Sequence, residues 1–126
     1  KVVVAGGTGF LGRYISRALL DAGHEVTVLS RSGSTSGIPQ LAGANATKAD
    51  VTDPSSLRGR LDGADAVVGA VTFPTSPAEV PRRGITFDRY DRQGTDHLLD
   101  EAAARIYRTG PSTWDGRWHV VVLGSN

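Results

Sequence analysis

The stretch Val2-Val3-Val4-Ala5-Gly6-Gly7-Thr8-Gly9-Phe10-Leu11-Gly12-Arg13 decides the fold of this chain. Its three consecutive valines predict a buried strand, and Gly6, Gly9 and Gly12 form a G-x-x-G-x-x-G turn at the end of that strand. An amphipathic helix is expected directly after the turn. A unit of this kind points several backbone N–H groups, and the positive end of a helix dipole, at one place. We therefore expect the turn to bind a diphosphate.

The rest of the chain predicts an alternation of strands and helices. Apolar residues recur at helical spacing over residues 11–22, and a valine-rich strand over 25–29 completes a βαβ unit. No helix is evident before the next strand. Further strands are expected at 46–50, 66–71 and 119–123, and further helices from Asp53-Pro54 onward and over 87–105. We expect an irregular loop or lid at 72–84, and in the last helix Tyr90, Gly94, Leu98 and Ala102 should face the sheet.

This order of elements indicates an α/β fold with helices on both faces of a parallel sheet. We expect a doubly wound, Rossmann-type sheet of about five strands in the order 3-2-1-4-5, truncated after the fifth strand. The glycine turn then lies at the switch point of the sheet, where ligands bind. In the first helix, Leu11, Ile15, Ala18, Leu19 and Ala22 should face the sheet, and Arg13, Ser16, Arg17 and Asp21 should lie on the other side.

The residues after the second strand bear on the choice of nucleotide. A site for NAD usually places Asp or Glu there to accept hydrogen bonds from the ribose 2′-hydroxyl. This chain has Ser30-Arg31-Ser32 and no acid. A guanidinium at Arg31 suits a 2′-phosphate, with help from Ser30 and from Arg13. We therefore expect NADP(H), with NAD as the alternative; solvated surface arginines are the competing interpretation.

Asp50 and Val51 follow the third strand. We expect the Asp50 carboxylate to accept a hydrogen bond from the adenine amino group while the Val51 side chain packs on the ring. Asp50 could instead cap the next helix, a role for which Asp53 competes. The histidines His24, His97 and His119 are spaced neither for a metal site nor for a Ser-His-Asp group, and we expect structural roles for them.

Composition and charge argue against several kinds of function and partner. With 126 residues, no cysteine and a net charge of +1, the chain excludes thiol catalysis and disulfides and argues against nucleic acid or an anionic membrane as partner. No apolar run approaches the roughly 20 residues of a membrane span, and no signal peptide is visible. We expect one incomplete NAD(P)-binding Rossmann domain over residues 1–126, located in the cytoplasm.

Together these motifs resemble the N-terminal half of the short-chain dehydrogenase/reductase superfamily, in its extended and atypical branches. Gly6 to Gly12 is similar to the family's phosphate-binding turn, and Arg31 stands where NADP-preferring members carry a basic residue. Residues 91–102 resemble the family's central helix. The resemblance implies that the cofactor is held by Gly6, Thr8, Gly9, Phe10, Leu11, Gly12, Arg13, Ser30, Arg31, Asp50, Val51, Ala70 and Val71.

The chain departs from the family at its catalytic pair. Members carry Tyr-x-x-x-Lys, whereas lysine occurs here only at Lys1 and Lys48, so no catalytic residue is assigned. Ser125 falls about where the family places a hydroxyl residue. The resemblance thus implies the NADP(H)-binding portion of an oxidoreductase or sugar-nucleotide epimerase with an unknown small-molecule substrate. The alternatives are a non-catalytic NAD(P)-sensing protein of the atypical branch and a homodimer completed through the open sheet edge.

Overall fold

The computed structural model describes residues 1–70, 93–109 and 119–122. The expected loop at 72–84 and the expected start of a helix at Phe87 lie outside these residues. The elements in chain order are β1 (Val2–Ala5), α1 (Phe10–Asp21), β2 (Val26–Ser30), the 3₁₀ helix η1 (Pro39–Leu41), β3 (Asn45–Lys48), α2 (Pro54–Leu57), β4 (Ala66–Gly69), α4 (Gly94–Thr109) and β5 (His119–Val122).

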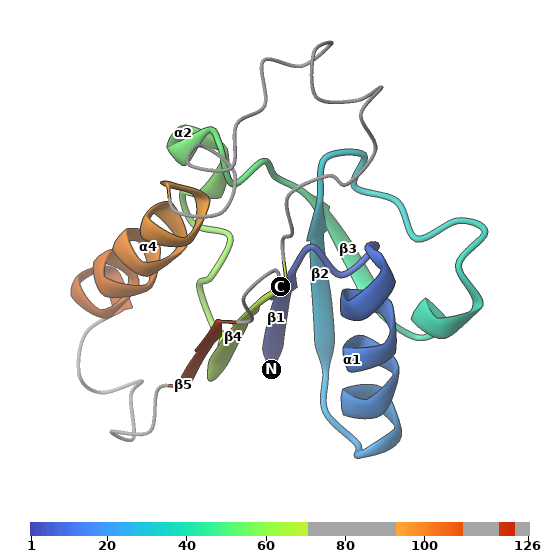
Figure 1. The fold of residues 1–126 in the computed structure, drawn as a ribbon. Helices are drawn as coiled ribbons and strands as arrows, with labels where there is room; N and C mark the ends of the chain where they lie inside the picture. Colours follow the sequence, from blue (N-terminus) through green and yellow to red (C-terminus); the bar gives the residue numbers. More distant parts are fainter. Residues whose placement is uncertain (71–92, 110–118, 123–126) are drawn as a thin grey trace, which may run out of the picture.

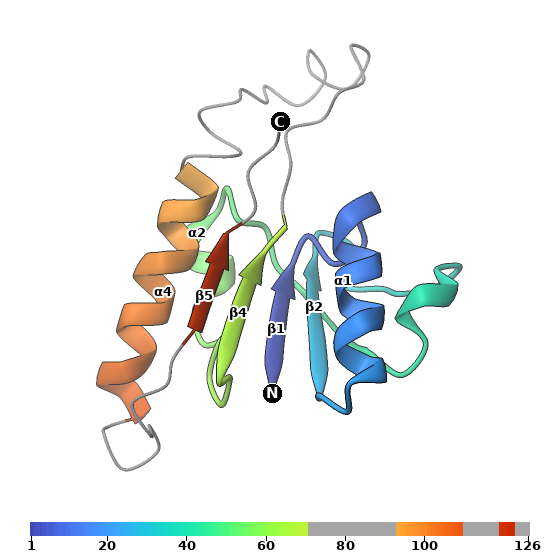
Figure 2. The same cartoon turned by 60° about the horizontal axis from the view of Figure 1, so that its bottom comes forward.

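The strands form one parallel sheet of five strands in the order β3-β2-β1-β4-β5 (Figures 1 and 2). The register pairs Val2 with Val26 on one side and with Ala66 on the other. The carboxyl ends of the three central strands therefore meet at one edge, where the glycine turn leaves β1. The doubly wound Rossmann-type fold predicted from the sequence is confirmed.

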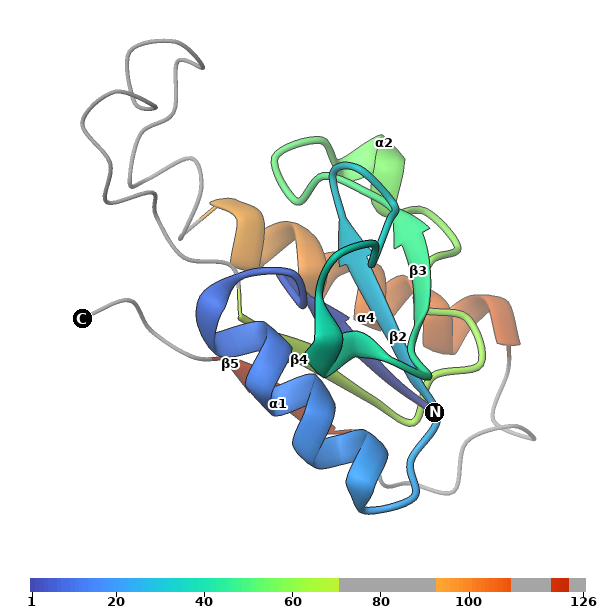
Figure 3. The same cartoon turned by 90° about the vertical axis from the view of Figure 1, so that its right-hand side faces the viewer.

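Helices cover both faces of the sheet (Figure 3). On one face, Val3 and Ala5 of β1 pack with Leu98 and Ala102 of α4. On the other face, Val2 and Val4 belong to a cluster against which Ile15, Leu19 and Leu20 of α1 pack. Because β1 is buried on both sides, its side chains are apolar without alternation, as is typical of a central parallel strand.

The boundaries of several elements differ from the prediction. The helix missing before the third strand is represented by η1, a single 3₁₀ turn that contributes the buried Leu41 to the core. The long helix continues past Arg105 to Thr109, and its predicted sheet-facing residues Leu98 and Ala102 are each 5% exposed. Within the described part of the chain, none of the helices has the length and apolarity needed to cross a bilayer.

The predicted faces of α1 are partly wrong. Ser16, expected on the polar side, is fully buried, whereas Leu11 is 44% exposed. The reason is the close approach of the helix to the glycine turn, since a Cβ at Gly7 would lie 3.4 Å from the Ser16 hydroxyl oxygen. Only a small side chain fits there, and its hydroxyl donates to the Gly12 carbonyl at 2.8 Å.

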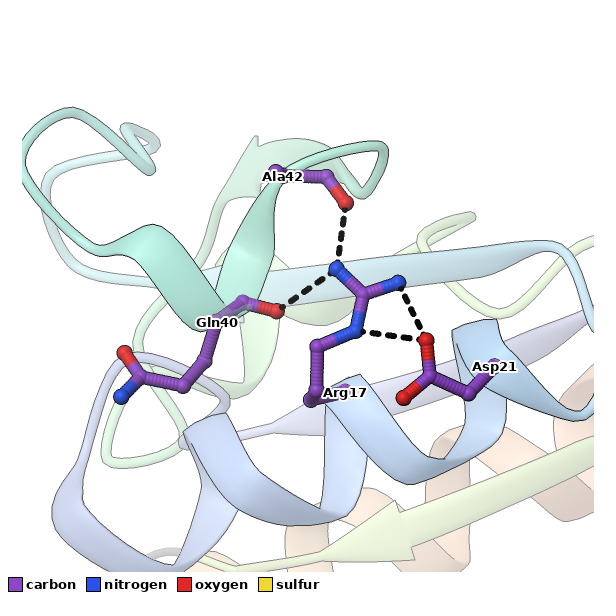
Figure 4. Close-up of polar contacts among 4 residues, drawn as sticks. All are labelled: Arg17, Asp21, Gln40 and Ala42. Carbon is purple, nitrogen blue, oxygen red and sulfur yellow. Dashed lines mark hydrogen bonds and ion pairs between the residues drawn. The ribbon is translucent and has the colours of Figure 1, made fainter.

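Arg17 ties α1 to the segment around η1 (Figure 4). Its Nη1 donates to the Ala42 carbonyl oxygen at 2.9 Å and to the Gln40 carbonyl oxygen at 3.5 Å. Its Nε and Nη2 face the Asp21 carboxylate at 3.0 and 2.9 Å. A single guanidinium thus holds the connection between β2 and β3 against the first helix.

Candidate functional site

The turn between β1 and α1 is shaped by glycines with different tasks. Gly6 has φ of 76°, a conformation that favours glycine, and its carbonyl oxygen accepts from the Gly9 N–H at 3.0 Å. A Cβ at Gly12 would lie only 2.1 Å from that same oxygen, so a side chain there would force the helix away from the turn. At Gly9 the corresponding distance is 3.3 Å.

Gly7 completes this cradle, although the sequence motif did not single it out. A Cβ at this position would lie 2.3 Å from Cγ1 of Val28 on β2. The sequence signal was the run of two consecutive glycines directly after β1. Only glycine fits at position 7, because a side chain there would collide with Val28. The turn can therefore pack closely against β2.

The first turn of α1 offers its N–H groups to a ligand. The helix begins at Phe10, its N-cap Gly9 makes no side-chain hydrogen bond, and the first turn carries no acidic residue. Such N–H groups have no partner within the helix and suit a phosphate. The Phe10 side chain is 81% exposed and stacks edge-on against Tyr14 with ring centroids 5.6 Å apart. Phe10 and Leu11 thus carry exposed side chains at the start of α1, and their role in holding the cofactor stays a prediction.

Arg13 braces the turn from outside. Its Nη2 donates to the Thr8 carbonyl oxygen at 2.8 Å and its Nε to the Gly9 carbonyl oxygen at 3.2 Å. These bonds fix the Arg13 side chain against the backbone of the turn. The predicted help of Arg13 at a 2′-phosphate stays a prediction.

The loop after β2 is a built turn and not a free linker. The Ser30 hydroxyl is buried and accepts from the Gly33 N–H at 2.9 Å. Gly33 has φ of 69°, and a Cβ there would lie 3.0 Å from the Cβ of Lys48 on β3. Ser30 therefore shapes the loop, which leaves the exposed Arg31 at its start beside the end of β3.

An open groove of about 360 Å³ lies beside this loop. Within the described residues, the side chains of its three cations, Arg31, Lys48 and Arg60, make no hydrogen bond or ion pair. Of these three cations, only Arg31 was predicted from the sequence to bind the cofactor, because Lys48 and Arg60 belong to no motif. The groove is lined by Arg31, Lys48, Ala49, Asp50, Asp53, Ser56 and Arg60.

The loop after β3 presents Asp50 to this groove. Its Oδ1 accepts from the Thr52 N–H at 2.9 Å and from the Thr52 hydroxyl at 2.7 Å. The Ser56 hydroxyl bridges the Asp50 main chain, accepting from its N–H at 2.9 Å and donating to its carbonyl at 2.8 Å. Ser56 is a positioning residue that the sequence did not reveal. The Asp50 Oδ2 has no hydrogen-bond or ion-pair partner among the described residues, and its predicted contact with an adenine amino group stays a prediction.

Val51 lies in the core. Its side chain is 6% exposed and belongs to the cluster with Leu57 and Leu98, and its predicted packing on an adenine ring stays a prediction. Its carbonyl oxygen lies 2.6 Å from Nδ1 of His97 on α4. His97 thus has a structural role, as predicted, because it fastens the loop to the central helix.

Asp53 caps α2 as the sequence predicted. Its Oδ1 accepts from the Ser55 N–H at 3.1 Å and from the Ser55 hydroxyl at 2.6 Å. The hydroxyl bond is the main cause that lowers the pKa of Asp53 below its ordinary value of 3.8; the main-chain N–H groups and His97 add to it.

The remaining predicted residues lie near or beyond the end of β4. Ala70 is 4% exposed, and its N–H donates to the Ala5 carbonyl at 2.9 Å, beside the start of the glycine turn. Val71 and Ser125 lie outside the described residues. No group of three or more His, Cys, Asp or Glu side chains that could hold a metal ion occurs in the described ranges.

Comparison with known proteins agrees with this geometry. A model of the NAD dependent epimerase/dehydratase family matches residues 2–125. The chain is 39% identical over 99 residues to photosystem II assembly factor Ycf39 of Synechocystis, covering 79% of this chain and 28% of that protein. It is 36% identical over 129 residues to 2-alkyl-3-oxoalkanoate reductase of Stenotrophomonas maltophilia, covering 96% of this chain and 36% of that protein.

A solved structure shares the fold. The NAD-dependent NDP-hexosamine 5,6-dehydratase TunA superposes with a TM-score of 0.66 at 24% identity, covering 96% of this chain and 35% of that one. The chain thus spans 28% and 36% of the length of the two curated relatives. The glycine cradle, which a Cβ would fill at Gly7 or Gly12, fits the linked phosphates of a dinucleotide. The chain is an NAD(P)-binding, Rossmann-type portion of a protein of the NAD dependent epimerase/dehydratase family.

Proposed function

We propose that the protein prefers NADP(H) to NAD(H) and that this chain is the cofactor-binding portion of an oxidoreductase or a sugar-nucleotide epimerase. The observation that carries the preference is Arg31, which is exposed directly after β2 and makes no ion pair with a described residue. A guanidinium in that position suits a phosphate dianion on the 2′-oxygen of the ribose.

The composition of the loop supports the same preference. Residues 30–37 contain no Asp or Glu that could accept hydrogen bonds from a ribose 2′-hydroxyl. The groove does contain a carboxylate near the end of a strand. It belongs to Asp50, which follows β3 and not β2. Its free Oδ2 suits the adenine amino group instead. The loop therefore lacks the group that favours NAD and holds the group that favours NADP.

The division of labour follows from these contacts. The bound nicotinamide would supply or accept the hydride. The chain's own residues bind and orient the cofactor: the N–H groups of the glycine turn hold the diphosphate, and Ser56 and His97 fix the loop that carries Asp50. The proton donor that such a reaction needs is not among the residues assigned here, since the chain contains no Tyr-x-x-x-Lys.

Titration with NADPH and NADH tests the preference directly. We expect NADPH to bind at least about tenfold more tightly, and Arg31→Glu to remove most of that advantage while changing NADH affinity little. Arg58→Glu is the matched control, because it makes the same charge change at the residue directly after α2, which does not line the groove. Equal affinities of the wild type for the two cofactors would refute the preference.

A second candidate function is a binding protein that uses the dinucleotide without turning it over. The similarity to the photosystem II assembly factor Ycf39 favours it. Sequence beyond Asn126 distinguishes the two. A Tyr-x-x-x-Lys there, together with oxidation of the bound nucleotide by a carbonyl substrate, supports the enzyme; the lack of both supports the binding protein.

A further inference from the structure

Three cations from separate elements line the groove beside the loop after β2. Arg31 follows β2, Lys48 is the last residue of β3, and Arg60 follows α2. Neither the family motif nor the glycine turn accounts for Lys48 or Arg60. Positive charges on a solvated surface have no reason to gather at one place, whereas these three residues line a single groove of about 360 Å³.

The backbone holds Lys48 next to Arg31. The register pairs Lys48 with Ser30 across β2 and β3, and the Ala49 N–H donates to the Ser30 carbonyl oxygen at 2.9 Å. The loop is pressed onto this pair, since a Cβ at Gly33 would meet the Lys48 backbone nitrogen at 3.1 Å. Both cations therefore start from fixed backbone positions on one side of the groove.

The backbone of Arg60 is fixed by the core. Its N–H donates to the Leu57 carbonyl oxygen at 2.9 Å. Leu57 and Leu61, which flank it, are both 0% exposed and belong to the same core cluster. The turn that carries Arg60 is thus anchored at both ends, and only the long side chain is free to move.

The two carboxylates of the groove do not neutralise these cations. Oδ1 of Asp50 is taken up by Thr52, and Oδ1 of Asp53 by Ser55. Neither carboxylate forms an ion pair with Arg31, Lys48 or Arg60 among the described contacts. The groove therefore combines unneutralised cations with a carboxylate oxygen of Asp50 that is free to accept from an amino group.

We propose that Lys48 and Arg60 act with Arg31 as specificity-determining residues that enclose the 2′-phosphate of an adenosine moiety. The inference rests on the proposed NADP(H) preference and extends the 2′-phosphate site from one residue to three, Arg31, Lys48 and Arg60. A phosphate dianion that three cations hold, from the loop after β2, the end of β3 and the turn after α2, makes more charge-assisted hydrogen bonds than it can make to one surface arginine.

Adenosine fragments of the cofactor test the site without the rest of the molecule. We expect Lys48→Gln and Arg60→Gln each to weaken 2′,5′-ADP binding about three- to tenfold, and the double variant more than tenfold. Affinity for 5′-AMP and for NADH should not change. Arg58→Gln, the neighbouring arginine outside the groove, is the matched control and should leave 2′,5′-ADP binding at the wild-type value.

The position of the phosphate separates an enclosing site from general attraction by positive charge. We expect 3′,5′-ADP, which carries the same charge, to bind more weakly than 2′,5′-ADP and to be less sensitive to the two substitutions. Equal losses for both isomers, or a loss with Arg58→Gln as large as with Arg60→Gln, would overturn the proposal.

Failure of this inference is distinguishable from failure of the proposed function. If Arg31→Glu removes the NADPH preference but Lys48→Gln and Arg60→Gln leave 2′,5′-ADP binding unchanged, only the proposed role of Lys48 and Arg60 is wrong. If the wild type shows no preference for 2′,5′-ADP over 5′-AMP, the proposed cofactor preference is wrong as well. Thermal unfolding of each variant in the absence of ligand checks that the fold is intact.

Discussion

At the scale of single residues, contact distances separate glycines that look alike in the motif. A Cβ would lie 2.1 Å from the Gly6 carbonyl oxygen at Gly12 but 3.3 Å from it at Gly9. Gly9 also has φ of −70°, which any residue adopts. The motif alone treats these positions as equivalent, whereas the packing of α1 on the turn makes only one of them intolerant of a methyl group.

Alanine substitution should reveal this difference. We expect Gly12→Ala to lower the free energy of unfolding by about 3 kcal/mol, because the obstructing atom belongs to the backbone and cannot rotate away. Gly9→Ala should cost less than about 1 kcal/mol. Urea unfolding of both variants measures the values, and similar losses would show that the turn relaxes around either side chain.

The Asp53 carboxylate predicts a pH dependence of stability. Because the Ser55 hydroxyl lowers the pKa of Asp53 below 3.8 in the folded chain, the carboxylate stabilises the fold fully at pH values above this ordinary value. The contribution is lost as the pH falls through the lowered folded pKa. Stability between about pH 5 and about pH 3 should therefore fall more steeply in the wild type than in Asp53→Ser.

Asp53→Ser is the informative variant because serine keeps an N-cap oxygen but removes the titrating group. Urea unfolding at a series of pH values compares the two proteins. Parallel curves over this range would mean that Asp53 titrates alike in the folded and unfolded chains.

At the scale of elements, Arg17 shows how one side chain secures a connection that the sequence does not predict. The segment between β2 and β3 contains only η1 as regular structure, yet Leu41 within it is 1% exposed. The two carbonyls that Arg17 binds, at Gln40 and Ala42, flank that leucine (Figure 4). The guanidinium therefore holds Leu41 in the core from outside.

We expect Arg17→Ala to destabilise the fold by about 1 kcal/mol through the lost carbonyl bonds. Asp21→Ala should cost about 0.5 kcal/mol or less, because the Arg17–Asp21 pair is an exposed ion pair within one helix. Thermal unfolding of both variants measures the difference. A larger effect at Asp21 would show that the ion pair, and not the clamp on η1, is the stabilising contact.

Elements with a clear apolar pattern were predictable, and those set by close contacts were not. The valines of β1 and β2 and the spacing of Leu98 and Ala102 predicted buried surfaces correctly, since local pattern and burial agree there. Ser16 was assigned to the wrong side because periodicity does not show how near α1 comes to the turn. Asp53-Pro54 predicted the start of α2 because a cap is a local signal.

At the scale of the whole molecule, cofactor binding and stability are linked. A ligand that binds only the folded chain raises the free energy of unfolding by about 2.7 kcal/mol at about 100 times its dissociation constant. At equal concentrations, a tenfold preference for NADPH adds about 1.4 kcal/mol over NADH. We expect a larger rise in melting temperature with NADPH than with NADH, and we expect most of this difference to disappear in Arg31→Glu. The same rise with both cofactors in the wild type would contradict the preference.

The site was predictable only in part, for reasons of distance along the chain. Arg31 and Asp50 were assigned because each follows the carboxyl end of a strand of the parallel sheet, β2 and β3 respectively, and their contacts with a cofactor stay predictions. Ser56 and His97 were not linked to Asp50 and Val51, since their contacts depend on how α2 and α4 pack on the sheet. The substrate, the homodimer and the cytoplasmic location stay predictions.

The contact between Gly7 and Val28 has a consequence for recognition. It joins the glycine turn to the strand that leads into Arg31, so the backbone positions of the turn and of Arg31 are fixed relative to each other. Under the proposed NADP(H) preference, the distance between the diphosphate site and the 2′-phosphate site is then set before the cofactor binds. We expect a bulkier residue at position 28 to displace the turn and to weaken NADPH and NADH binding alike, which titration of both cofactors measures.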